Sequence, residues 1–236
     1  MKTSVPLRSS RSAGLTLVEL LVVIAIIVVL VGLTGPWCTI SAQKKGRLTD
    51  SLSNCKQINL ALRMYAGDHD GKFPVLRADG QPFASGDFSN RALEQLMPKY
   101  STSKKIFINK ASAWCKDAAA DSGQADAFLL KRGQNDWNYI TGLNEKSDVR
   151  WPLIVTATAS ASNLTYTNSL TAKGGVWGGT DVIIGFVDGS ARPLSGKEMD
   201  LTDKTKTFPK RTDNGTSMFI GTPDWLGTGR LILAPE

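Results

Sequence analysis

The feature that most constrains this chain is an apolar run near its N-terminus. Residues 15–33 read LTLVELLVVIAIIVVLVGL, and Glu19 carries the only charge among them. A helix needs about 20 predominantly apolar residues to cross the hydrocarbon core of a bilayer. The run therefore predicts a helix at residues 15–35 that spans a membrane once.

The charges on either side of this run predict its orientation. The segment before it carries Lys2, Arg8 and Arg11 but no acidic residue, which is typical of a cytoplasmic flank. The basic residues of KKGR at 44–47 follow on the far side and weaken this signal. We expect the N-terminus to lie in the cytoplasm and the rest of the chain beyond the membrane.

Three kinds of targeting segment could explain the run. A cleaved secretory signal would need small residues after it, and a lipoprotein signal would need them before Cys38, but Trp37 stands there. A plain signal anchor fits the apolar run but gives no reason for Glu19. Because an acidic side chain in lipid is costly and by default functional, Glu19 marks a functional site.

The residues around the start of the run resemble a known signal. GLTLVE at 14–19, after a short basic leader, resembles the class III signal of type IV pilins and type II secretion pseudopilins. The resemblance implies cleavage between Gly14 and Leu15 by a prepilin peptidase and methyltransferase, followed by N-methylation of Leu15. It also implies that Glu19 is the acidic residue used in assembly. Leu15 departs from the Phe that family members most often carry.

The chemistry of this motif is consistent with assembly. Cleavage frees an α-amino cation, and Glu19 of one subunit can pair with the amine of a neighbour. Either charge alone would be costly in apolar surroundings, so pairing disfavours subunits in the wrong register. The partners that the resemblance implies are other pilin or pseudopilin subunits, an inner-membrane assembly platform and membrane lipid. The head would be periplasmic, or extracellular in an assembled filament.

A second helix is expected after Gly35 and Pro36, which interrupt the first. Apolar residues recur at intervals of three and four from Leu48 to Tyr65, which predicts an amphipathic stem. The turn DHDG at 68–71 ends it. The stretch from Asn54 to Pro74 itself resembles pilin-like proteins of planctomycetes and verrucomicrobia. The expected organisation is a leader at 1–14, a membrane helix at 15–35, a stem at 36–67 and a head at 68–236.

The head is expected to be α+β, with the long N-terminal helix packed on a small antiparallel sheet. We predict a short helix at 90–100 and strands at 105–108, 137–141, 153–157 and 182–187. Asp188-Gly189 predicts a hairpin turn to a strand at 190–194. This hairpin and the glycine-rich stretch at 173–179 resemble the same pilin-like group, except that Gly178 stands where those proteins often carry a histidine.

The composition disfavours an enzyme. His69 is the only histidine, and the chain has no G-x-S-x-G motif, so a catalytic triad would depend on a residue in a turn. We expect no cofactor. Weak calcium candidates are four residues of a late loop, namely Asp200, Asp203, Asp213 and Asn214, and Asp68, Asp70 and Asp79 form a looser group. Ordinary turn chemistry explains both sets better.

The cysteines and the net charge of +7 leave alternatives open. Cys55 and Cys115 could form a disulfide in an oxidising compartment, with Cys38 unpaired or intermolecular. The basic residues are scattered, so no specific nucleic acid is expected. We predict a non-enzymatic subunit of a type II secretion pseudopilus or type IV pilus-like filament. The alternatives are a membrane-anchored binding module and, less favoured, an anchored hydrolase.

Overall fold

The computed structural model describes residues 16–33, 37–115, 128–159, 166–167, 169–195, 212–213, 216–217 and 230–236. The chain divides into two compact units, Met1–Lys45 and Gly46–Glu236. Helix α1 (Leu17–Leu33) belongs to the first, and helix α2 (Trp37–Gly67) runs from the first into the second. Among the described residues, no helix has both the length and the apolar character that crossing a membrane requires.

Helix α2 confirms the stem predicted from the spacing of apolar residues. Cys55, Ile58 and Leu62 have no exposed surface, and Leu48 and Tyr65 pack at the edge of the same core. The helix ends at Gly67, and the amide of Gly71 donates to the carbonyl of Ala66 at 2.8 Å. Gly71 has a φ of +75°, which glycine adopts without strain, so the DHDG sequence ends the helix as expected.

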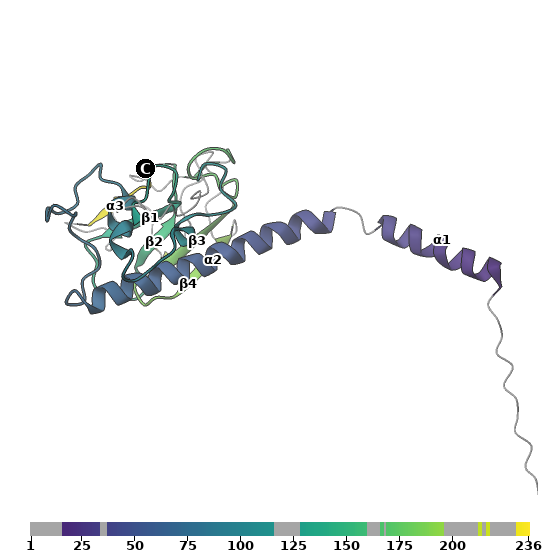
Figure 1. Ribbon diagram of the computed structural model, residues 1–236, viewed down its shortest axis with the longest axis horizontal. Helices are drawn as coiled ribbons and strands as arrows, with labels where there is room; N and C mark the ends of the chain where they lie inside the picture. The colour runs from purple at the N-terminus through teal and green to yellow at the C-terminus, as the bar shows by residue number, and fades with distance from the viewer. Residues whose placement is uncertain are drawn as a thin grey trace, which may run out of the picture. The chain divides into compact units, whose positions relative to one another are not determined.

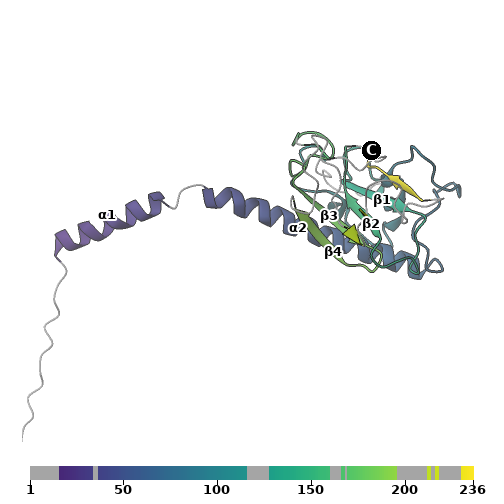
Figure 2. The same ribbon diagram turned by 180° about the vertical axis from the view of Figure 1, so that it is seen from behind.

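The head contains an antiparallel sheet that lies against α2 (Figure 1). Its strands are β1 (Trp137–Thr141), β2 (Pro152–Thr156), β3 (Asp181–Phe186), β4 (Ala191–Ser195) and β7 (Leu231–Leu233), in the order β4-β3-β2-β1-β7 (Figure 2). A separate two-stranded ribbon pairs β5 (Thr212–Asp213) with β6 (Thr216–Ser217). These elements confirm an α+β fold with a helix on a small antiparallel sheet.

The hairpin predicted from Asp188-Gly189 joins β3 to β4. The amide of Gly189 donates to the carbonyl of Phe186 at 3.0 Å, and the amide of Phe186 donates to the carbonyl of Ser190 at 2.8 Å. Gly189 takes the positive φ of +85° that a three-residue hairpin loop requires at its last position. The predicted strands at 137–141, 153–157 and 182–187 match β1, β2 and β3 to within one residue.

One local prediction was wrong, and another gave a helix that is too long. The expected strand at 105–108 is instead the 3₁₀ helix η2 (Lys104–Phe107), because the hydroxyl of Ser103 accepts from the amide of Lys105 and caps a helical turn. The expected helix at 90–100 is shorter: α3 (Ser89–Leu93) continues as the 3₁₀ helix η1 (Glu94–Leu96), and Pro98 follows. Strand β7 was not predicted.

Candidate functional site

Thr16 and Glu19 form reciprocal hydrogen bonds at the start of α1. The backbone N–H and the hydroxyl of Thr16 both donate to Oε2 of Glu19, each at 2.8 Å. The backbone N–H of Glu19 donates to Oγ1 of Thr16 at 3.3 Å. This arrangement is a capping box, in which the side chains three residues apart satisfy each other's backbone amides. The T-x-x-E spacing of Thr16 and Glu19 is the sequence signal of this capping box.

The capping box fixes where the carboxylate of Glu19 lies. Its hydrogen bond to the amide of Thr16 turns the side chain back toward the N-terminus of the helix. Gly14 and Leu15, the predicted cleavage and methylation residues, lie outside the described residues. Along the chain, however, Leu15 is the residue that directly precedes Thr16. The carboxylate of Glu19 therefore binds the amide of Thr16, and Thr16 is the next residue in the chain after the one whose nitrogen cleavage would release.

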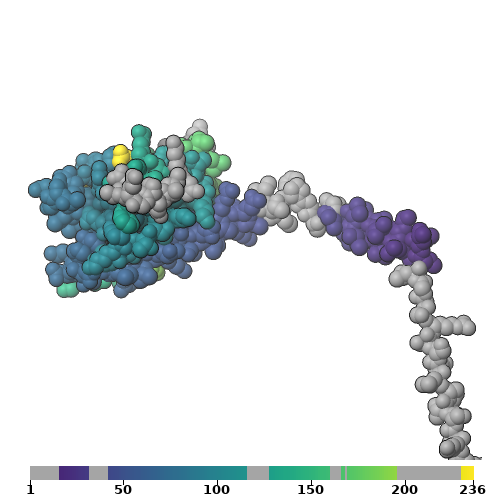
Figure 3. Space-filling model, in the orientation of Figure 1, coloured from purple at the N-terminus to yellow at the C-terminus, as the bar shows by residue number. Residues whose placement is uncertain are grey.

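Apart from Glu19, the side chains of helix α1, drawn in purple in Figure 3, are apolar. From Leu17 to Val31 its large apolar side chains are all highly exposed, from 47% at Val23 to 79% at Leu17. Glu19 is the only charged residue in the helix. A helix that is apolar all round is stable when lipid or other protein surrounds it. Within its own unit, α1 thus presents an apolar surface that calls for an external partner.

A second arrangement connects α2 to the β3–β4 hairpin. The side-chain amide of Asn59 donates to the carbonyls of Ser190 at 3.1 Å and Phe186 at 3.4 Å. The guanidinium of Arg63 donates to the carbonyl of Asp188. A Cβ at Gly185 would lie 2.5 Å from the amide nitrogen of Asn59, so only glycine permits this approach. The two segments that resemble the pilin-like group beyond the N-terminus therefore meet here.

The glycine-rich stretch packs closely against the chain that follows β2. A Cβ at Gly174 would lie 2.2 Å from the backbone nitrogen of Ala159, and Gly174 has a φ of +82°. Val176 and Trp177, within the stretch, are buried. Gly178, at the position of the family histidine, lies in a turn and donates its amide to the carbonyl of Gly175 at 2.9 Å. The stretch therefore has a packing role that does not require a histidine.

His69 is part of an aromatic contact at the end of α2. Its ring stacks on that of Tyr65, with centroids 3.8 Å apart, and its Nδ1 lies 2.7 Å from the carbonyl oxygen of Tyr65. Asp68 forms an ion pair with Lys99 at 2.7 Å and accepts from the hydroxyl of Tyr100 at 2.8 Å. These hydrogen bonds lower the pKa of Asp68. The turn is held by structural contacts, and the expectation that the chain is not an enzyme stays a prediction.

The calcium candidates are only partly within the described residues. Asp200, Asp203 and Asn214 lie outside them, and Asp213 forms a backbone pair with Thr216 in the β5–β6 ribbon. In the part of the chain that the structure describes, no group of three or more His, Cys, Asp or Glu side chains could hold a metal ion. Asp79 of the looser group pairs with Arg77 at 3.4 Å.

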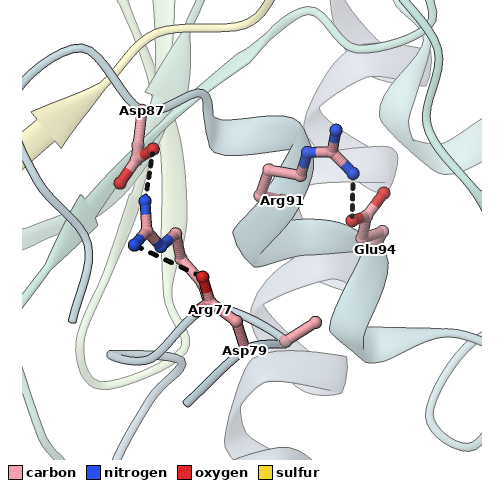
Figure 4. A pocket seen from close by; sticks show the side chains of 6 residues that line it. Arg77, Asp79, Asp87, Arg91 and Glu94 are labelled. Carbon is pink, nitrogen blue, oxygen red and sulfur yellow. Dashed lines mark hydrogen bonds and ion pairs between the residues drawn. The ribbon is translucent and has the colours of Figure 1, made fainter. Parts of the chain in front are cut away.

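A pocket of about 280 Å³ lies beside α3. Figure 4 shows Arg77 facing both Asp79 and Asp87, and Arg91 facing Glu94. The Arg77–Asp87 and Arg91–Glu94 ion pairs measure 3.5 Å and 3.4 Å. Ala78 completes the lining, which contains no serine, cysteine or histidine. The lining is therefore formed mainly by paired charges.

The predicted disulfide partners are both buried. Cys55 has no exposed surface and Cys115 has 6%. Cys55 is a free thiol on the packed face of α2, and burial raises its pKa. The disulfide between Cys55 and Cys115 stays a prediction. Cys38 lies in the first turn of α2.

Comparison with known proteins finds a match for the N-terminal segment. The family model described as the prokaryotic N-terminal methylation motif matches residues 9–35. No match is found among curated proteins or among solved structures. The matched residues include the predicted cleavage site at Gly14 and Leu15 and the capping box of Thr16 and Glu19. The chain therefore carries, at residues 9–35, the N-terminal methylation signal of type IV pilins and pseudopilins.

Proposed function

We propose that this chain is a prepilin-like subunit that is cleaved after Gly14, methylated on the nitrogen of Leu15 and assembled into a filament. The filament would be a type II secretion pseudopilus or a type IV pilus-like fibre. Before assembly, the chain would be held in the inner membrane by α1, with its head beyond the membrane. The single observation that carries the proposal is the methylation motif at residues 9–35.

The geometry of Glu19 supports a role in assembly. The capping box holds its carboxylate at the N-terminus of α1, which is where cleavage would create a positive charge. The acid can therefore pair with the new amine of its own chain or with that of an adjacent subunit. In an apolar filament core, a subunit that left either charge unpaired would be strongly disfavoured. Pairing would thus select the correct stagger between subunits.

The apolar surface of α1 supports association through this helix. Exposed apolar side chains cover α1 from Leu17 to Val31, and they would be unfavourable in water. Lipid can cover them before assembly, and the α1 helices of other subunits can cover them afterwards. The same surface therefore serves both the stored and the assembled form. Under this proposal the head takes no part in the contacts between α1 helices.

Mass measurement of the chain from the membrane fraction tests the processing step. We expect a mature protein that begins at Leu15 and carries one additional methyl group. Gly14→Val should leave the leader attached, whereas Ala13→Val, one residue earlier, should be processed as the native chain is. A mature chain that begins elsewhere, or cleavage unaffected by Gly14→Val, would overturn the proposal.

Two substitutions at residue 19 test the assembly step. Gln can accept the same capping hydrogen bond as Glu but carries no charge, whereas Ala removes both. We expect both Glu19→Gln and Glu19→Ala to insert into the membrane and to abolish sheared filaments. If Glu19→Gln assembles as well as the native chain, the charge is not needed and the pairing argument fails. If Glu19→Ala also assembles, neither the charge nor the capping hydrogen bond is needed for assembly. If the native chain itself forms no filaments, it acts as an anchored binding module.

A further inference from the structure

Asp136 is a buried acidic residue directly before β1. Only 1% of its surface is exposed. Its amide donates to the carbonyl of Phe107 at 2.9 Å, and its carbonyl accepts from the amide of Ala157 at 2.8 Å. The backbone of Asp136 thus continues the pairing of β1 with β2, and the side chain cannot leave the interior without breaking it.

The surroundings of this carboxyl group are poor in hydrogen-bond donors. Asn109 and Ser112 are polar side chains close to it, and their hydrogen bonding lowers its pKa less than burial raises it. Asn109 is held in place because its Oδ1 accepts from the hydroxyl of Ser51 at 2.8 Å and from the amide of Ala111. Even so, Oδ2 of Asp136 accepts no hydrogen bond from the described residues. An ionised carboxylate has about four acceptor sites, so these donors are too few.

A second acceptor without a partner lies on the same side of the strand. Asn138 is fully buried, and its Nδ2 donates to Oγ1 of Thr158 at 2.6 Å, which fixes the orientation of its amide. Its Oδ1 accepts no hydrogen bond from the described residues. Residues two apart on a strand face the same way, so Asp136 and Asn138 present two unpartnered oxygens on one face. A proton on Asp136 would supply the missing donor.

No described cation neutralises Asp136. None of the ion pairs among the described residues involves it. The segment beside it carries Lys104, Lys105, Lys110 and Cys115, of which Lys110 pairs with Asp50 at 3.9 Å. From the loop that follows β2, the titratable group is Tyr166, whose hydroxyl donates to the carbonyl of Thr156 at 3.2 Å.

We propose that Asp136 keeps its proton in the folded head and shares it with Oδ1 of Asn138, which makes the head a pH-sensitive structure. Burial without a cation raises the pKa of Asp136 well above its ordinary value, in agreement with this assignment. In the unfolded chain the carboxyl group titrates near pH 3.9. The stabilising contribution is complete below that pH and is lost as the pH rises through the folded pKa.

Unfolding of the full chain in detergent, followed across pH, tests this proposal. Asp136→Asn is the informative variant, because Asn places an N–H donor where the protonated acid has its O–H and does not titrate. We expect the native melting temperature to fall as the pH rises above about 4. Asp136→Asn should lack this fall and should exceed the native protein at high pH. Asp70→Asn, at an exposed site, should keep the native dependence.

Infrared difference spectroscopy gives a second readout that does not depend on a stable variant. The native protein should show the carbonyl band of a protonated carboxyl group at pH values where exposed acids are ionised. Parallel melting curves for the native chain and Asp136→Asn, or the absence of this band, would overturn the proposal. Stabilisation of the native chain by added Ca²⁺, absent in Asp136→Asn, would also overturn it, because a cation would then hold the two oxygens.

Discussion

The two long helices of this chain differ in whether their apolar side chains are exposed or buried. Helix α1 exposes its large apolar side chains on every side, whereas α2 buries one face, including Ile58 and Leu62, in the core of the head. Both are built from helix-compatible residues, so the difference is one of pattern. A helix with one apolar stripe can bury it against the core of its own domain. A helix that is apolar all round needs lipid or other protein to cover it.

The two helices therefore differ in what their apolar surfaces can stabilise. Apolar area removed from water contributes roughly 25 cal/mol per Å², so the packed face of α2 stabilises the head by itself. The same area on α1 stabilises nothing until lipid or another subunit covers it. The methylation motif at residues 9–35 includes α1, whereas the residues that contact the sheet belong to α2. The methylation signal and the contacts that stabilise the head therefore lie in separate segments.

The largest expected effect is on the buried face of α2. Leu62→Ala should lower the free energy of unfolding of the head by about 2–5 kcal/mol, because Leu62 has no exposed surface and its removal leaves a cavity. Leu60→Ala is the matched control, since Leu60 lies on the same helix with 60% of its surface exposed. It should change stability by less than about 0.5 kcal/mol. Denaturant unfolding measures both.

Equal losses of stability for Leu62→Ala and Leu60→Ala would contradict the difference in packing between the two faces of α2. In that case the outer face of α2 would be as tightly packed as the inner one. Helix α2 would then need an external partner, as α1 does.

The next effect concerns α1 and should appear in the membrane fraction. Ile24→Lys places a charge near the middle of the apolar helix, which disfavours insertion by about 2.5–3.5 kcal/mol. Gln57→Lys places the same charge on the exposed face of α2 and should leave membrane partition unchanged. Quantifying each variant in membrane and soluble fractions tests this. If Ile24→Lys partitions as the native chain does, α1 is not held in lipid.

The sequence was sufficient for those parts of the fold that repeat a pattern. The spacing from Leu48 to Tyr65 predicted α2, and the Asp188-Gly189 pair predicted the β3–β4 hairpin, because both signals are local. The prediction failed at residues 105–108, where a short apolar run fits a strand or a helical turn equally well. Ser103 decided the outcome through its capping bond. Strand β7 has three residues and depends on its pairing with β1.

The candidate site was predictable in its residues but not in its geometry. The order of glycine, apolar residue and acid indicated Gly14, Leu15 and Glu19, since the signal is read along the chain. The contribution of Thr16 could have been found from the T-x-x-E spacing. Asp136 could not have been found, because tertiary folding brings Asn109 and Ser112 to it from a distant part of the sequence. Burial of a charge is not encoded in a local pattern.

A smaller effect should follow from the contact between α2 and the hairpin. Asn59→Ala removes the hydrogen bonds to the carbonyls of Phe186 and Ser190. We expect a loss of about 1–3 kcal/mol in the unfolding free energy of the head, because each of the two hydrogen bonds contributes about 0.5–1.5 kcal/mol. Both carbonyls keep a backbone amide as a donor. Gln57→Ala, on the exposed side of the helix, is the control. Unchanged stability in Asn59→Ala would show that these two hydrogen bonds do not stabilise the contact between α2 and the hairpin.

The smallest effect is expected at the exposed end of α2. The ion pair with Lys99 and the hydrogen bond from Tyr100 lower the pKa of Asp68. Lys99→Ala should therefore raise that pKa toward about 3.9, which NMR titration of the carboxyl group can measure. Because the folded pKa is depressed, the pair stabilises the head above the unfolded pKa, and this contribution is lost as the pH falls through the folded value.

The change in stability from Lys99→Ala should be small at neutral pH, because exposed ion pairs are screened by water and salt. Lys110→Ala is the control, since Lys110 pairs with Asp50 and should leave the titration of Asp68 unchanged. A large loss of stability from Lys99→Ala would mean that the end of α2 depends on charge more than on its buried face. Within α2 the contrast between packed and exposed sides would then fail, and only the contrast with α1 would remain.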